Sequence, residues 1–241
     1  QDPWEAVKVN NGEQIVIVLA TGTGRFLHLE NGRGRLSVST AGRTKGHACA
    51  ADAFGVAAVS AHGVAIPFTA TAKVETFSSD GPRRVFYYAN GTAITPGNFS
   101  STGGTVRQKP DLAAADGVAT AVPHFQPFYG TSAAAPHAGA IAALLKARNP
   151  SLTASEARTA LTTGVLDIEA AGRDRDSGVG LLMADLVLQA VGTAQAPTLT
   201  GFTPSTGPVG TTVTLSGTKF SGATAVKFNG TSASSFTVNG N

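Results

Sequence analysis

The feature that most constrains the fold is an alanine-rich run over residues 132–146. Alanine and leucine are strong helix formers, so the run predicts a helix over residues 132–146. Pro136 is compatible with such a helix because the first turn makes no intrahelical N–H bonds. Gly139 is expected to let the helix pass close to a sheet.

Ser132 begins this predicted helix, and its chemistry allows two interpretations. Serine is a common helix N-cap, so Ser132 could have a purely structural role. Alternatively, the backbone N–H of a residue at this position is unpaired and lies at the positive end of the helix dipole. Such an N–H can stabilise an oxyanion that forms where the hydroxyl attacks. Both interpretations follow from the position alone.

Alternating apolar and polar residues predict strands before this helix. Residues 15–19, 25–30 and 35–40 form three candidates, and Asn31-Gly32 between the last two predicts a hairpin turn. Residues 1–40 are therefore expected to be rich in β-structure. A buried strand is expected within residues 54–60, and an exposed hairpin is expected at residues 85–95 around Asn90-Gly91.

Two more helices are predicted towards the C-terminal side. Thr153 and Glu156 have the spacing of a capping box, which predicts a helix from there to about Thr162. A third helix is expected over residues 180–191. Beyond residue 198 the chain is rich in Thr, Ser, Gly and Val, and its alternating segments at 211–217, 225–228 and 235–238 predict an all-β unit.

Composition excludes several classes of protein. Hydrophobic residues make up 42% of the 241 residues and charged residues only 14%, which argues against disorder. No apolar run approaches the roughly 18–20 residues of a membrane span. The net charge of +3 comes from scattered basic residues, so no nucleic-acid partner is expected. Cys49 is the only cysteine, which excludes an internal disulfide and a Cys-x-x-Cys zinc site.

The stretch from Gly130 to the end of the alanine-rich run resembles the nucleophile motif of the subtilisin-like serine proteases. That motif is Gly-Thr-Ser-x-x-x-Pro-His followed by a glycine and a buried helix, and its fixed positions are present here as Gly130, Thr131, Ser132, Pro136 and His137. The segments at 46–59, 77–82, 109–114 and 177–190 are similar to further family segments in the same order. The resemblance covers about residues 40–191. It departs at residues 115–117, where Ala-Asp-Gly replaces the family's Pro-Gly.

The resemblance implies a serine endopeptidase that acts on protein or peptide substrates. Ser132 would attack the scissile carbonyl, while its N–H and the Thr131 hydroxyl would help to hold the oxyanion. Gly130 would allow close backbone approach at the turn, and Pro136 and His137 would have structural roles. The implied fold is α/β: a partial subtilisin-like parallel-sheet domain with a β-rich N-terminal insertion, followed by an incomplete all-β Ig-like sandwich.

The family's catalytic Asp and His motifs do not occur before Ser132 in this sequence. We therefore expect residues 1–192 to hold only part of a peptidase domain, with residues 1–40 as the insertion. The catalytic Asp, the catalytic His and the oxyanion-hole Asn would lie upstream of these residues. The 241-residue chain alone is accordingly expected to have little or no peptidase activity.

The remaining histidines and two aspartates are candidates for other roles. His124 is an alternative base for Ser132, although a base also needs a buried carboxylate to orient it. His28 is expected on a strand surface, and His47 and His62 flank the strand at 54–60 in structural roles. Asp52 is interpreted as a turn residue and Asp111 as a hydrogen-bond acceptor in a loop.

Residues 198–241 resemble the IPT/TIG family of immunoglobulin-like domains, and residues 193–197 form a linker. The matching residues are Pro204, Gly207, Pro208, Gly210, Val213, Gly217, Phe220, Val226, Phe228 and Gly230. Because an Ig-like sandwich takes about 100 residues, this unit is expected to be partial. The resemblance implies a secreted protein in which the module is a spacer or a binding module, and as a binding module it would take a cell-surface, carbohydrate or protein partner. An alternative function is therefore a catalytically incomplete protease scaffold used for extracellular binding or adhesion.

No cofactor is implied by the sequence. The segment Asp174-Arg-Asp-Ser-Gly178 suggests a calcium loop, but its glycine comes one position early and apolar residues follow it. The sequence therefore contains no ligand pattern that supports a structural calcium ion, and we interpret the segment as a solvated turn.

Overall fold

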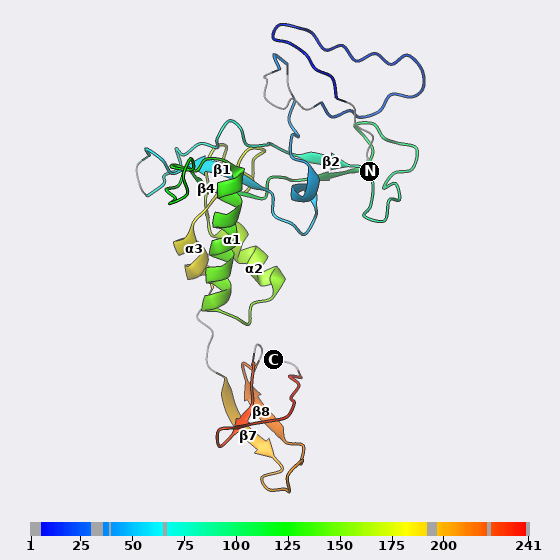
Figure 1. The fold of residues 1–241 in the computed structure, drawn as a ribbon. Helices are drawn as coiled ribbons and strands as arrows, with labels where there is room; N and C mark the ends of the chain where they lie inside the picture. The colour runs from blue at the N-terminus through cyan, green and yellow to red at the C-terminus, as the bar shows by residue number, and fades with distance from the viewer. Residues whose placement is uncertain are drawn as a thin grey trace. The chain divides into compact units, whose positions relative to one another are not determined.

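A computed structural model of the chain describes residues 6–29, 36–38, 40–64, 67–191, 197–220 and 223–239 (Figure 1). The chain divides into two compact units. One unit comprises Gln1–Arg35 and Arg84–Thr105, and the other comprises Leu36–Arg83 and Val106–Asn241. Each unit is described by itself below.

A four-stranded sheet forms the centre of the larger unit, with the order β1-β4-β6-β5. Its strands are β1 (Val56–Ser60), β4 (Leu112–Asp116), β5 (Val165–Leu166) and β6 (Leu181–Leu182). β1 pairs parallel to β4 from Val56↔Leu112 to Ser60↔Asp116, and β4 pairs parallel to β6. β5 joins antiparallel to β6. The result is the mixed, mostly parallel sheet expected of an α/β fold.

Helix α1 (Thr131–Arg148) packs against β1 and β4 (Figure 1). The contact is close because both surfaces present alanine: Ala134 of the helix packs with Ala58 and Ala114 of the strands. Further along, Leu145 is fully buried in a cluster with Leu112. The small residues that favour the helix therefore also let it lie directly on the sheet.

Two shorter helices complete this layer. α2 (Ala154–Thr163) begins with the expected capping box, since Thr153 Oγ1 accepts the Glu156 N–H and a Glu156 carboxylate oxygen accepts the Thr153 N–H at 2.8 Å. α3 (Ala184–Ala190) places Val187 in the cluster with Leu145. A 3₁₀ turn, η1 (Gly46–Cys49), precedes β1 and buries Cys49.

Two expectations about these helices are wrong. The third helix does not begin at residue 180, because Leu181 and Leu182 extend as β6 and pair with β4 and β5. Sheet pairing with buried neighbours outweighs the helix propensity of leucine there. Gly139 is exposed, and a Cβ at that position would meet no described atom within 4 Å. Gly139 is therefore not needed for close packing within the described residues.

The smaller unit is held by aromatic contacts and by the expected hairpin. Residues 86–94 pair across the turn through a Tyr87↔Ala93 bridge, and the Phe26 N–H bonds to the Phe99 carbonyl at 2.7 Å. Residues 6–29 contain no strand, so the strand expected at 15–19 and the described part of the one expected at 25–30 are not formed. The expectation that residues 1–40 are rich in β-structure is therefore wrong for the described residues. No described segment forms a ladder with these residues, and an unpaired strand has little stability of its own. The turn expected at Asn31-Gly32 lies outside the described residues.

Two short strands, β2 (Arg83–Val85) and β3 (Thr105–Arg107), form a two-stranded sheet. Both lie next to the hairpin in sequence.

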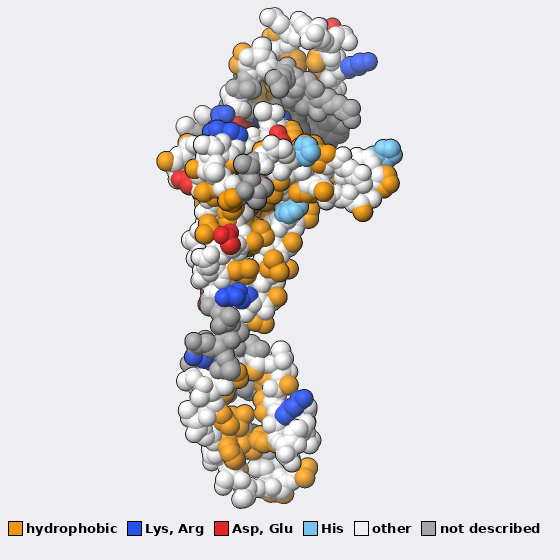
Figure 2. Space-filling view, turned by 90° about the vertical axis from the view of Figure 1, so that its left-hand side faces the viewer, with side chains coloured by type: hydrophobic (Ala, Val, Ile, Leu, Met, Phe, Trp, Pro, Cys, Tyr) orange, Lys and Arg blue, Asp and Glu red, His pale blue; other side chains and the backbone are white. Residues whose placement is uncertain are grey.

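The C-terminal residues form short antiparallel pairs. β7 (Thr198–Thr203) pairs with β8 (Thr214–Thr218), and β9 (Lys227–Phe228) pairs with β10 (Thr231–Ser232) across the expected Asn229-Gly230 turn. No strand is assigned at 235–238. Apolar side chains lie at the surface of this part of the chain (Figure 2). The pairs are consistent with an Ig-like region.

Candidate active site

The first turn of α1 places Ser132 at the surface. Gly130 is the N-cap and has φ 124°, a conformation that side chains rarely adopt. Its carbonyl accepts the N–H groups of Ala133 at 2.8 Å and Ala134 at 3.2 Å. Within the described residues, the hydroxyl and the N–H of Ser132 have no hydrogen-bond partner, and the residue is exposed. Both groups can therefore contact an incoming molecule.

A buried carboxylate holds the residue before this turn. Asp116, the last residue of β4, accepts the Gly130 N–H on Oδ2 at 2.7 Å. Its exposed fraction is 0%, and its Oδ1 has no hydrogen-bond partner among the described residues. Sequence reasoning noted Asp116 only as a departure from the family pattern and assigned it no role.

The chain between Asp116 and Gly130 forms a loop that closes on itself. Val118 and Phe128 bridge in antiparallel fashion, with N–H to carbonyl distances of 3.2 and 2.8 Å. The Phe125 ring meets the Phe128 ring edge-on at 4.8 Å. Tyr129, directly before the turn, packs edge-on against His62 at 6.0 Å. Two separate aromatic contacts therefore hold the chain just before Ser132.

No histidine of the described residues forms a hydrogen bond with Ser132. His137 Nδ1 lies 2.9 Å from the Ala133 carbonyl in its own helix, so its ring is engaged within α1. His124 is exposed, has φ 68° and forms no hydrogen bond with a carboxylate. His47 and His62 are also exposed. The described residues thus supply Ser132 with no bonded base.

The Lys-Pro-Asp segment before β4 is an internal anchor of the sheet. Asp111 Oδ2 accepts the Gly55 N–H at 2.7 Å and pairs with Lys109 Nζ at 2.6 Å. Asp111 Oδ1 lies 3.3 Å from Arg158 Nη1 of α2, and the Arg158 guanidinium lies over the Phe54 ring. Asp111 is therefore a hydrogen-bond acceptor as expected, and it joins the starts of β1 and β4 to α2.

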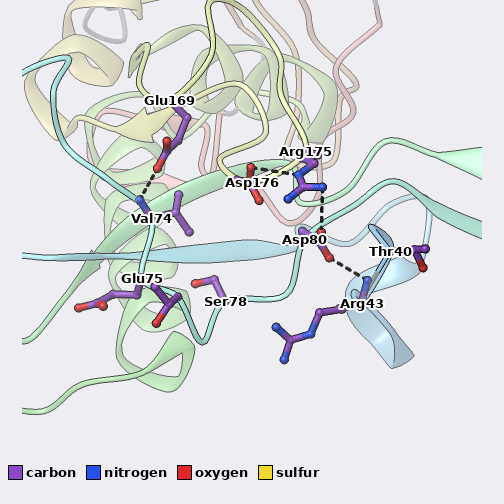
Figure 3. A pocket seen from close by; sticks show the side chains of 10 residues that line it. Thr40, Arg43, Val74, Glu75, Ser78, Asp80, Glu169, Arg175 and Asp176 are labelled. Atoms are coloured by element: carbon purple, nitrogen blue, oxygen red, sulfur yellow. Dashed lines mark hydrogen bonds and ion pairs between the residues drawn. The ribbon is translucent and has the colours of Figure 1, made fainter. Parts of the chain in front are cut away.

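A charged hollow of about 390 Å³ lies beside the Phe77–Pro82 loop (Figure 3). Asp80 accepts the Arg43 N–H at 3.1 Å and lies 3.8 Å from Arg175, while Glu169 accepts the Val74 N–H at 2.8 Å. The hollow therefore holds several charged side chains that are already engaged, namely Asp80, Glu169, Arg175 and Asp176. None of its lining residues belongs to the Ser132 turn.

The Asp174–Gly178 segment is a turn closed by its own hydrogen bonds. Asp174 Oδ1 accepts the N–H groups of Asp176 and Ser177, both at 2.7 Å, and Oδ2 accepts the Ser177 hydroxyl at 2.6 Å. Among the described residues, no group of three or more His, Cys, Asp or Glu residues could hold a metal ion.

No helix in the described part of the chain is long and apolar enough to cross a membrane.

The fold and the turn together define an α/β protein with an exposed serine at the start of a helix that covers a mostly parallel sheet. The model of the Subtilase family, peptidase S8, matches residues 1–180, so the chain belongs to this family of serine peptidases. The IPT/TIG domain model matches residues 197–241.

Two known proteins show more limited similarity. Over 53 residues the chain is 45% identical to the minor extracellular protease Epr of Bacillus subtilis (strain 168), a match that covers 22% of this chain and 8% of Epr. The crystal structure of fervidolysin from Fervidobacterium pennivorans, a keratinolytic enzyme related to subtilisin, matches with 23% identity and a TM-score of 0.34. That match covers 61% of this chain and 20% of fervidolysin. The chain thus matches a small part of either protein.

Proposed function

We propose that the protein is a serine endopeptidase in which Ser132 is the nucleophile. The observation that carries this proposal is the state of Ser132: an exposed residue at the N-terminus of α1 whose hydroxyl and N–H both lack a partner among the described residues. A structural N-cap would direct its side-chain oxygen to a free backbone N–H. Here the N-cap is Gly130, and Ser132 makes no cap hydrogen bond.

In the proposed reaction the Ser132 Oγ attacks the scissile carbonyl and transfers its proton to a histidine base. The carbonyl oxygen becomes an oxyanion, which the Ser132 N–H and the Thr131 hydroxyl stabilise at the positive end of α1. The histidine then protonates the leaving amine, and an acyl-enzyme remains on Ser132. Water activated by the same histidine releases the acyl group and restores the serine.

The base and its orienting carboxylate are proposed to come from chain outside these 241 residues. The reason is that no described histidine bonds to Ser132, whereas a serine nucleophile requires an adjacent base. The oxyanion-hole Asn would come from the same source. His124 would replace this base only if it acquired an orienting carboxylate, and none bonds to it among the described residues.

The proposed organisation is a partial peptidase domain over residues 1–192, a linker at 193–197 and a partial Ig-like module over 198–241. The proposed location is extracellular, as for Epr, and the proposed substrates are proteins or peptides. Exposed apolar side chains in the module favour a second candidate function, binding to an extracellular partner. The residues concerned are Leu199, Phe202, Phe228, Phe236 and Val238.

Hydrolysis of a quenched fluorescent peptide library tests the proposal. The full-length protein is expected to cleave the peptides, and Ser132→Ala is expected to abolish cleavage. Ser151→Ala, at a partly buried serine in the loop between α1 and α2, is the matched control and should keep full activity. The 241-residue chain alone should be inactive for lack of a base. Activity of the full-length Ser132→Ala variant would contradict the assignment, and activity of the short chain would favour His124 as the base.

A further inference from the structure

Asp116 continues a row of β4 side chains that faces α1. Side chains two apart in a strand lie on the same face, so Leu112, Ala114 and Asp116 share one face of β4. Leu112 packs in the cluster with Leu145 of α1, and Ala114 packs with Ala134 nearer the start of the helix. Asp116 is the next member of the row and lies at the first turn of α1, where it reaches the Gly130 N–H.

This carboxylate bonds the N–H of the N-cap residue itself. Gly130 has no side chain and therefore offers the start of α1 no capping group of its own. Asp116 Oδ2 accepts the Gly130 N–H at 2.7 Å, so it fixes the backbone from a neighbouring strand. A carboxylate at a helix N-terminus is also favoured by the helix dipole.

The burial of the Asp116 carboxylate lowers the stability of the folded state, and packing alone does not explain it. Asp116 is fully buried, and its Oδ1 has no partner among the described residues. A buried polar atom without a hydrogen bond destabilises the folded state, whereas an apolar side chain of the same shape would not. Proteins commonly give up stability where an active site needs a particular geometry.

We infer that Asp116 is a positioning residue, which fixes the Gly130–Ser132 turn so that the Ser132 hydroxyl and N–H meet the substrate carbonyl in a reactive geometry. The inference rests on the proposed function of Ser132 and deepens it. Ser132 follows the anchored N–H of Gly130 by two residues, so a shift of Gly130 moves the nucleophile and the oxyanion donor together. Misplacement by about 1 Å can cost about 100-fold in rate.

The test compares three variants of the full-length protein. Asp116→Leu keeps the number of side-chain heavy atoms and the branching at Cγ but removes the acceptor, and Asp116→Ala removes both. Asp116→Asn keeps an oxygen that can accept the Gly130 N–H. Asp174→Ala is the control, because it removes a carboxylate that accepts backbone N–H groups in a separate turn. The readouts are kcat and KM for a peptide, the labelling rate of Ser132 by a fluorophosphonate, the melting temperature and amide hydrogen exchange at Gly130.

Asp116→Leu and Asp116→Ala are expected to lower kcat and the labelling rate by about 100-fold while KM changes little, because the turn is displaced rather than the substrate surface. Exchange at Gly130 should accelerate in both variants. Asp116→Asn should restore most of the rate, and Asp174→Ala should lower the melting temperature without changing kcat. If the Asp116→Ala variant does not fold, the Asp116→Leu variant still tests whether Asp116 positions the turn.

Wild-type labelling rates in a folded Asp116→Leu protein would overturn the inference and leave the proposed function intact. An Asn variant as slow as the Leu variant would also overturn it, because the hydrogen-bond acceptor would then not be the source of the effect. A wild-type protein that is not labelled at Ser132 would contradict the proposed function itself, and the inference would fail with it.

Discussion

Lys109 Nζ and Asp111 Oδ2 lie 2.6 Å apart, and their side chains are only 3% and 10% exposed. The pair is completed by the Ala53 carbonyl, which accepts from Lys109, and by the Gly55 N–H, which donates to Asp111. An exposed ion pair stabilises a protein by about 0–1 kcal/mol, but removing one partner of a buried pair costs about 3–5 kcal/mol. The Lys-Pro-Asp segment is therefore a structural anchor of β1 and β4.

Lys109→Met is accordingly expected to lower the free energy of unfolding by about 3–5 kcal/mol, because Asp111 keeps its buried charge but loses its closest cation. Urea denaturation measures this change. Lys73→Met is the control, since Lys73 pairs with Glu169 while its side chain remains 66% exposed. Equal effects of the two substitutions would show that burial does not set the strength of the Lys109 pair.

Two glycines are expected to respond to alanine in opposite directions. Gly178 has φ 69°, and a Cβ there would lie 2.4 Å from the Asp111 backbone, so Gly178→Ala should destabilise the fold by more than about 1 kcal/mol. Gly139 lies in α1 with open space around it, so Gly139→Ala should stabilise the fold by about 0.5–1 kcal/mol. Thermal unfolding of both variants tests these signs, and a destabilising Gly139→Ala would indicate an unrecognised close contact at that residue.

The capping box of α2 should make stability depend on pH. Hydrogen bonds from the Thr153 N–H and hydroxyl lower the pKa of Glu156 below its ordinary value. A carboxylate with a lowered pKa in the folded state stabilises that state above its unfolded pKa, and this contribution is lost as the pH falls through the folded pKa. The melting temperature of Glu156→Gln should therefore lie below that of the wild type at pH 7, and the difference should shrink towards pH 3. A constant difference would contradict this assignment.

Cys49 is expected to be a slow nucleophile in the folded protein. Burial raises the pKa of its thiol, an effect that the nearby cations Arg83, Lys109 and Arg107 only partly oppose. Because the thiolate is the reactive form, alkylation by iodoacetamide at pH 8 should be slow in the native protein and fast in urea. Similar rates in both conditions would show that Cys49 is accessible in the native state.

Local signals predicted the helices that pack on the sheet. The alanine-rich run predicted α1, and the spacing of Thr153 and Glu156 predicted the start of α2. Both are properties of a few neighbouring residues, so no tertiary information is needed. Leu181 and Leu182 show the limit of such reasoning, because their partners in β4 and β5 are far away in sequence and decide that they form a strand.

The candidate site was predictable only in part. The Gly130–Ser132 motif indicated where the serine turn lies, because its residues are consecutive. Asp116 was missed as a partner of Gly130, since the two residues are fourteen positions apart and meet only through the packing of β4 on α1. A signal was nevertheless present: Asp116 follows Leu112 and Ala114 at a spacing of two, which places a charge on the apolar face of a buried strand.

Fluorophosphonate labelling of the full-length protein, followed by mass spectrometry of its peptides, decides whether Ser132 is a catalytic nucleophile. These reagents modify a serine that an adjacent base activates, and they leave an ordinary capping serine unmodified. The predicted result is a single adduct on Ser132, absent from the Ser132→Ala variant and from the denatured protein. A folded full-length protein with no adduct on Ser132, or with its adduct on another serine, would contradict the proposed function.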